Sequence, residues 1–238
     1  MGIRANPAFA VGAVAVPVAA LVYALLFAPV VHHSYVHVMA GVLWTDIDLF
    51  IAIVLGPVLG GLSVEARTAV FERFTPKMAF LMPSLALVTV FGGVTLADRM
   101  GIFPYADPWI ALLALASTVP ALLLVGWQFD AFADPRWLAA FALVLLGGGA
   151  SLAVTASGFG MTGPTILLAL AIVTVLTVLG FGVLLPGEVR IYRQLQSGDP
   201  DPDVVSRIGM RNARLSGLQG LFQFAIVVVL GYLRWGGF

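Results

Sequence analysis

The stretch VHHSYVHVMAGVLWTDIDLFIAIVLG, residues 31–56, decides the fold class of this chain. Most of it is apolar enough to lie inside a membrane, yet it holds all three histidines of the chain together with Asp46 and Asp48. An ionisable side chain at the centre of a bilayer costs roughly 2.5–3.5 kcal/mol on insertion scales, so such residues indicate a functional site. We therefore expect the chemistry of the protein to lie in this segment.

The whole chain has the composition of a membrane protein. Of its 238 residues, 61% are hydrophobic and 10% are charged, whereas soluble domains have about 25% charged residues. Cysteine is absent, which excludes disulfides, thiolate metal sites and thiol catalysis. The net charge of zero gives no indication of nucleic-acid binding. We predict a single integral-membrane domain over residues 1–238, embedded in the lipid bilayer of a plasma or inner membrane.

Seven stretches have the roughly 20 apolar residues that a membrane-spanning helix needs. The predicted spans are Phe9–Val30, Tyr35–Leu62, Met78–Ala97, Trp109–Trp127, Trp137–Ala156, Thr165–Leu185 and Leu215–Tyr232. Polar connections join them, and the last connection runs from Glu188 to Arg214. We expect Glu188 to lie in a solvated helix end. The predicted fold is an all-α bundle of about seven transmembrane helices.

Basic residues predict the orientation of this bundle. With seven spans, ten of the twelve Lys and Arg residues fall on the side of the N-terminus, and only Arg99 and Arg234 fall on the other. The larger group consists of Arg4, Arg67, Arg73, Lys77, Arg136, Arg190, Arg193, Arg207, Arg211 and Arg214. We therefore predict a cytoplasmic N-terminus and an external C-terminus. The histidines then lie toward the outer surface, and the two aspartates lie near the middle of the membrane.

The polar residues of the second span are expected to point to two different sides of the helix. A residue advances about 100° around an α-helix, so one stripe contains His33, His37, Trp44 and Asp48. Asp46 points roughly opposite to His37, and each aspartate therefore needs a partner of its own. None of the spans contains Lys or Arg in its middle. Three arrangements stay open: a protonated carboxyl bonded to another helix, a bound external cation, or a partner subunit.

A second polar stripe follows the last span. Its members are Asn212, Ser216, Gln219 and Gln223, at positions i, i+4, i+7 and i+11. Amide side chains in an apolar helix form hydrogen bonds toward the inside of a bundle. The stripe is either a set of interhelical contacts or a polar lining that faces the second span, in which Gln223 approaches the depth of Asp48.

The histidine spacing permits a metal site. His33 and His37 at i and i+4 can both reach one metal ion, and His32 can join them only if the helix begins after it. All three histidines belong to one segment, so a bis-histidine haem within one chain is not expected. A haem b with one histidine ligand, a haem with a histidine and a methionine ligand, a haem whose second ligand comes from another subunit, or a copper ion stays open.

The segment HVMAGVLWTDIDLF, from His37 to Phe50, resembles the helix that marks a loose group of small membrane proteins. In this group, which includes the copper-resistance D domain and the HemJ-type protoporphyrinogen oxidases, a histidine precedes a Trp-x-Gly motif by seven residues. His37 and Trp44 match the pattern, but Asp46 stands where the glycine is expected. The resemblance implies a helical bundle whose histidine is a haem or copper ligand. The lysine-bearing helix of the HemJ type has no match, so that oxidase activity is not expected.

From these features of the sequence we expect one of three functions. The first is metal handling, with copper or haem bound through His37 and assisted by His33. The second is a proton- or cation-coupled transporter or channel that uses Asp46 and Asp48. The third is a non-catalytic membrane subunit that joins a homo-oligomer or a larger complex. The sequence identifies no catalytic residues, so we do not predict an enzyme.

Overall fold

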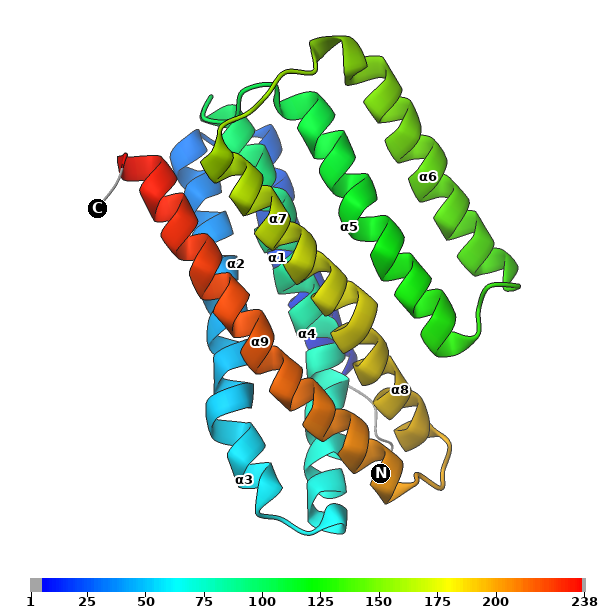
Figure 1. Cartoon of the computed structure of the whole chain (residues 1–238). Helices are drawn as coiled ribbons and strands as arrows, with labels where there is room; N and C mark the ends of the chain where they lie inside the picture. The colour runs from blue at the N-terminus through cyan, green and yellow to red at the C-terminus, as the bar shows by residue number, and fades with distance from the viewer. Residues whose placement is uncertain (1–5, 237–238) are drawn as a thin grey trace. The chain divides into compact units, whose positions relative to one another are not determined.

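The computed structural model describes residues 6–236, so Arg4, which contributes to the predicted charge bias, lies outside the described residues. The described residues form helices and no strands (Figure 1). The α-helices are α1 (Pro7–Leu26), α2 (Val30–Leu49), α3 (Gly56–Gly60), α4 (Val64–Arg99), α5 (Ala106–Phe129), α6 (Pro135–Thr155), α7 (Pro164–Leu179), α8 (Leu185–Gln196) and α9 (Pro202–Trp235). The π-helices are η1 (Phe50–Leu55) and η3 (Gly180–Leu184), and η2 (Ala156–Gly158) is a 3-10 turn.

Seven helical segments within residues 6–236 are long and apolar enough to cross a membrane. They are Pro7–Leu26, Val30–Gly60, Val64–Arg99, Ala106–Phe129, Pro135–Gly158, Pro164–Gln196 and Pro202–Trp235. The predicted class, an all-α bundle with seven spans, is therefore confirmed. These apolar helices are those of a multi-pass membrane protein and are consistent with contact with a lipid bilayer.

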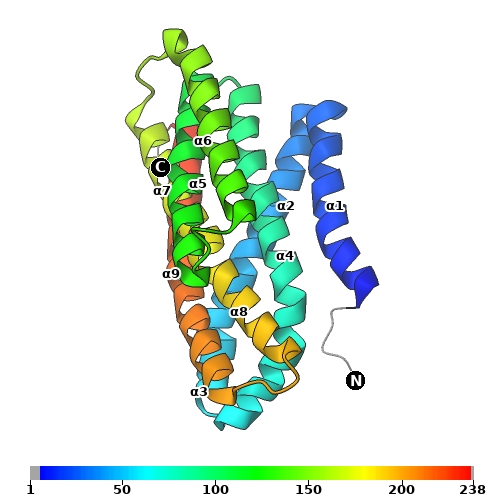
Figure 2. The same ribbon diagram turned by 90° about the vertical axis from the view of Figure 1, so that its right-hand side faces the viewer.

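The chain forms two compact units. Of the described residues, the first contains 6–93 and 184–221, and the second contains 94–183 and 222–236. In the first unit α1 packs against α2 (Figure 2). In the second unit α5 packs against both α6 and α7 (Figure 1). Most of the predicted site residues lie in the first unit, and Gln223 lies in the second.

The helices α4 and α9 are longer than predicted. Residues 64–77 and 202–214, expected as connections, are the first parts of α4 and α9, which have 36 and 34 residues. At 1.5 Å per residue these helices are about 54 and 51 Å long, against roughly 30 Å for the hydrocarbon core of a bilayer. Their charged N-terminal parts therefore extend beyond the hydrocarbon region.

These extensions fold together with α3 and α8 into a region that we call the juxtamembrane layer. It consists of α3, residues 64–77, α8 and residues 202–214, which lie side by side at one end of the first unit (Figure 2). The layer has an apolar core of Leu59, Phe71, Ile191, Leu195, Val205 and Ile208. The apolar positions repeat at three- and four-residue intervals between charged residues, as in an amphipathic helix. The sequence predicted polar connections over Glu65–Lys77 and Glu188–Arg214, and the structure shows that much of both connections is helical.

Both π-helices stand just before a proline. Pro57 is the second residue of α3, and Pro186 is the second residue of α8. Proline lacks an N–H group and its ring clashes with the carbonyl four residues earlier, so the preceding turn widens. Short π-helical segments of this kind are frequent at functional sites, and η1 begins two residues after Asp48.

Candidate functional site

Asp48 is buried in the first unit and has an amide donor. Its side chain is 1% exposed, and Nε2 of Gln219 donates a hydrogen bond to its Oδ2 over 2.8 Å. His33, Trp44 and Asp48 are all buried on α2, as the predicted stripe requires. The polar stripe of α9 faces α2 at this point. Gln223 is also buried, and its approach to Asp48 stays a prediction.

Small residues on α9 permit this contact. A side chain at Gly217 would approach Ala52 to 3.1 Å, and one at Gly220 would approach Leu49 to 2.6 Å. Glycines at such positions let two membrane helices come close together. The amide of Gln219 can therefore reach Asp48 across the contact between α9 and the segment formed by α2 and η1.

A second carboxyl group is held in the same way at the base of the juxtamembrane layer. Nδ2 of Asn212 donates to Oε1 of Glu188 over 3.1 Å and to the carbonyl of Leu184 over 3.2 Å. The buried Thr75 lies beside the same carboxylate. Oδ1 of Asn212 accepts a hydrogen bond from Arg211 over 3.3 Å. The expectation of a solvated Glu188 was wrong, because its helix packs against α9 and the carboxyl oxygen Oε2 is buried.

The two carboxamides occupy one face of α9. Asn212 and Gln219 are separated by seven residues, which is two turns and about 10 Å along the helix axis. Ser216, also buried, stands between them. The first unit therefore has two buried carboxyl–carboxamide pairs, Glu188 with Asn212 and Asp48 with Gln219, on one line of α9.

The two histidines of the stripe pack against α4. His33 is fully buried, and Nδ1 of His37 lies 3.0 Å from the carbonyl oxygen of Thr89. A carbonyl only accepts hydrogen bonds, so Nδ1 carries a proton, and in the neutral ring Nε2 then keeps its lone pair. A side chain at Gly93 would come within 2.7 Å of the His37 ring. The glycine therefore makes room for the imidazole.

The remaining candidates lie apart from these contacts. His32 and Asp46 are exposed on α2. Because α2 begins at Val30, the condition under which His32 could join the other histidines is not met. Within residues 6–236, no group of three or more His, Cys, Asp or Glu side chains is arranged to hold a metal ion.

Some residues of the site were not predicted from the sequence. Thr89 contributes only a backbone carbonyl, which no side-chain pattern reveals. The spacing between Glu188 and Asn212 crosses a turn, so helical phase could not pair them. The amphipathic pattern of α8 was the one available signal, since it places Ile191 and Leu195 on one face and Glu188 near the turn.

No protein-family model, curated protein or solved structure matches this chain. The resemblance of residues 37–50 to the His-Trp membrane proteins stays a prediction. The fold and the site define only the class of protein. It is a multi-pass helical membrane protein with two buried carboxyl–carboxamide pairs in its first unit.

Proposed function

We propose that the protein is a proton-coupled membrane transporter or channel, in which Asp48 takes up and releases the proton. The observation that supports this proposal is the 2.8 Å hydrogen bond from Gln219 to a carboxyl group buried far from either end of its span. An amide replaces the hydrogen bonds of water but brings no charge. Ionisable groups inside a membrane span are characteristic of proton relays, and a carboxyl with a neutral donor can exist in either protonation state.

The proposed route uses polar groups at three depths of the first unit. His33 and His37 lie on the N-terminal half of α2, and Asp48 lies about 22 Å beyond His33 along the helix axis. Glu188 and Asn212 follow about 10 Å from Gln219 toward the juxtamembrane layer. Protons would pass between these levels as the bundle changes conformation. Asp46 has no part in the route, because it is exposed on the other side of α2.

The proposal includes an orientation. The N-terminus is cytoplasmic, the C-terminus is external, and the membrane is the plasma or inner membrane. The juxtamembrane layer then lies in the cytoplasm and the histidines lie near the outer surface. The excess of basic residues on the N-terminal side supports this orientation.

Proton uptake by Asp48 can be tested without knowledge of a transported substrate. Infrared difference spectra of the purified protein, recorded across a pH titration, should contain the C=O stretch of a protonated carboxyl that disappears in Asp48→Asn. In liposomes with an internal pH-sensitive dye and an imposed membrane potential, Asp48→Asn should abolish proton flux.

Asp46→Asn provides a matched control, since it removes the same group two residues away on an exposed surface. It should leave both the infrared band and the flux unchanged. Wild-type flux that persists in Asp48→Asn would contradict the proposal, as would a carboxyl band that Asp48→Asn does not remove.

A second function is supported by the hydrogen bond between His37 and Thr89. Histidines that bind metals commonly donate their other ring N–H to a backbone carbonyl, and the bond of Nδ1 leaves Nε2 available for copper or haem iron. The described residues supply no complete ligand set, so the remaining ligands would come from His33, a small molecule or another chain. A haem bound there would supply one-electron redox chemistry.

Metal analysis and an absorbance spectrum of the purified protein test this second function. His37→Ala should remove copper or haem, whereas His32→Ala, which changes the exposed histidine, should not. Equal metal or haem content in the wild type and His37→Ala would contradict it.

A further inference from the structure

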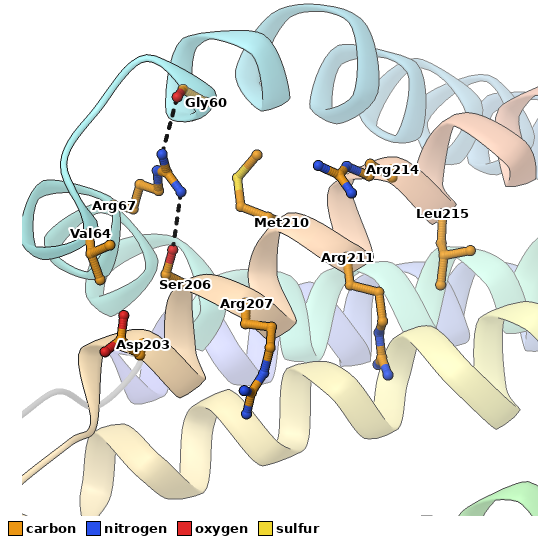
Figure 3. A pocket seen from close by; sticks show the side chains of 10 residues that line it. All are labelled: Gly60, Val64, Arg67, Asp203, Ser206, Arg207, Met210, Arg211, Arg214 and Leu215. Atoms are coloured by element: carbon orange, nitrogen blue, oxygen red, sulfur yellow. Dashed lines mark hydrogen bonds between the residues drawn. The ribbon is translucent and has the colours of Figure 1, made fainter.

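The juxtamembrane layer contains a pocket of about 720 Å³. It opens between the end of α3, the first turn of α4 and the N-terminal part of α9 (Figure 3). Its size is within the range of about 300–1,000 Å³ that is usual for small-molecule sites. The charged residues of its lining are Arg67, Arg207, Arg211, Arg214 and Asp203. Four arginines and one aspartate therefore line the pocket. Figure 3 shows the guanidinium groups of Arg207 and Arg211 directed away from those of Arg67 and Arg214.

Arg67 forms a fixed edge of the pocket. It donates from Nε to the carbonyl of Leu62 over 3.0 Å and from Nη2 to the carbonyl of Gly60 over 3.1 Å. The last carbonyls of a helix have no partner within the helix, so Arg67 caps the end of α3. Figure 3 shows the side chain between Gly60 and Ser206. This arginine is held in place before any ligand binds.

The side chains of the three arginines on α9 have fewer partners among the described residues, and one of them, Arg211, donates to Oδ1 of Asn212 over 3.3 Å. Arg207, Arg211 and Arg214 stand at i, i+4 and i+7, where like charges destabilise a helix by about 0.2–0.5 kcal/mol per pair. Neither the side chain of Arg207 nor that of Arg214 forms a hydrogen bond or ion pair with another residue of the described chain. Nε of Arg211 is buried and has no hydrogen-bond partner among these residues. The pocket thus presents unsatisfied donors and an excess of positive charge.

We propose that this pocket binds the phosphate group of an anionic ligand. Guanidinium groups bind phosphate oxygens through paired, charge-assisted hydrogen bonds, and Arg207, Arg211 and Arg214 place such donors along the α9 side of the pocket. The phosphate can belong to a phospholipid headgroup or to a free phosphate compound. Met210 and Leu215 add apolar surface to the lining, and the layer borders the apolar part of the spans. Both features favour a headgroup whose acyl chains extend along α9.

The test compares two phosphate sources on the full-length protein in a neutral detergent. Short-chain phosphatidylglycerol and inorganic pyrophosphate are titrated separately, and binding is measured by calorimetry. The pocket variant is Arg207→Gln with Arg214→Gln. The control is Arg73→Gln with Arg136→Gln, which removes the same charge from two other exposed arginines. The pocket variant should bind about tenfold or more weakly, since each basic residue contributes about 1 kcal/mol, whereas the control should bind like the wild type.

Each outcome decides the proposal. Binding of phosphatidylglycerol alone identifies a lipid headgroup as the source, and binding of pyrophosphate alone identifies a free phosphate compound. The proposal is overturned if neither probe binds saturably, or if both variants lose affinity equally. If the pocket variant aggregates, Arg207→Gln and Arg214→Gln are measured singly against Arg73→Gln by the same criterion. This test is independent of proton coupling at Asp48.

Discussion

The amide of Asn212 donates a hydrogen bond to the carboxylate of Glu188 over 3.1 Å, two helical turns from the point where Gln219 does the same for Asp48. Residues far apart in the sequence therefore repeat one arrangement, a buried carboxyl with a neutral amide donor. The Asn212 pair is further fixed by the bond to Leu184, the last residue of η3. This pair joins the juxtamembrane layer to the membrane-spanning part of α9.

Gly187→Ala should break this junction. A Cβ at Gly187 would lie 2.5 Å from Nδ2 of Asn212 and 2.6 Å from its Oδ1, so the amide must move and lose its bonds to Glu188 and Leu184. Buried polar groups left without partners cost about 1–3 kcal/mol each. Unfolding in detergent should show a loss of stability of this order. Gly149→Ala, with no atom within 4 Å of the added carbon, is the control, and equal behaviour of the two variants would contradict the prediction.

Gln219→Leu should destabilise the protein more than Gln219→Glu does at low pH. Leucine fills the space but leaves Asp48 without this donor, whereas a protonated glutamic acid can still donate. We expect a loss of about 1–3 kcal/mol for the leucine variant. Adding Asp48→Asn should recover little of it, since an asparagine oxygen also needs a donor. Adding Asp48→Leu should recover more, because the polar group is then removed. Denaturant titrations of the single and double variants measure these differences, and strictly additive losses would show that the two side chains are not coupled.

The sequence predicts those features of the site that lie within one helix, but not those that depend on contacts between two helices. Helical phase predicts that His33, Trp44 and Asp48 share the buried face of α2, because that information lies within one helix. The polar stripe of α9 was predicted for the same reason. The pairing of particular residues, such as Gln219 with Asp48, depends on how closely two helices approach. That approach is set by Gly217 and Gly220, whose effect a single helix does not reveal.

The juxtamembrane layer shows a different limit. The count of spans depends on apolar length, and it was predicted correctly. Residues 64–77 and 202–214 are too charged for that criterion and were predicted to be connections. Their stability comes from Phe71, Val205 and Ile208, which bury one face of each extension, so tertiary packing rather than hydropathy makes them helical.

Gly93→Ala should change the hydrogen bonding of His37. A Cβ there would lie 2.7 Å from Cε1 of the ring, so the imidazole must shift away from Thr89. Nitrogen NMR of histidine-labelled protein reports the tautomer of each ring, and the chain has only three histidines to assign. The wild type should show an Nδ1–H tautomer for His37 that Gly93→Ala reduces. Gly147→Ala, which meets no atom within 4 Å, should leave the spectrum unchanged. An unchanged His37 signal in Gly93→Ala would contradict the hydrogen bond.

The proposed orientation can be measured directly, because the chain contains no cysteine and every introduced thiol is therefore unique. Ser197→Cys lies between α8 and α9, and Ser157→Cys lies between α6 and α7, and both positions are exposed. With a cytoplasmic N-terminus, a membrane-impermeant maleimide added to intact cells should label Ser157→Cys and leave Ser197→Cys unlabelled. After the cells are opened, both variants should react, which shows that each thiol is accessible. Labelling of Ser197→Cys alone in intact cells would reverse the orientation. It would place the arginine pocket outside and make the histidines the cytoplasmic end of the proton route.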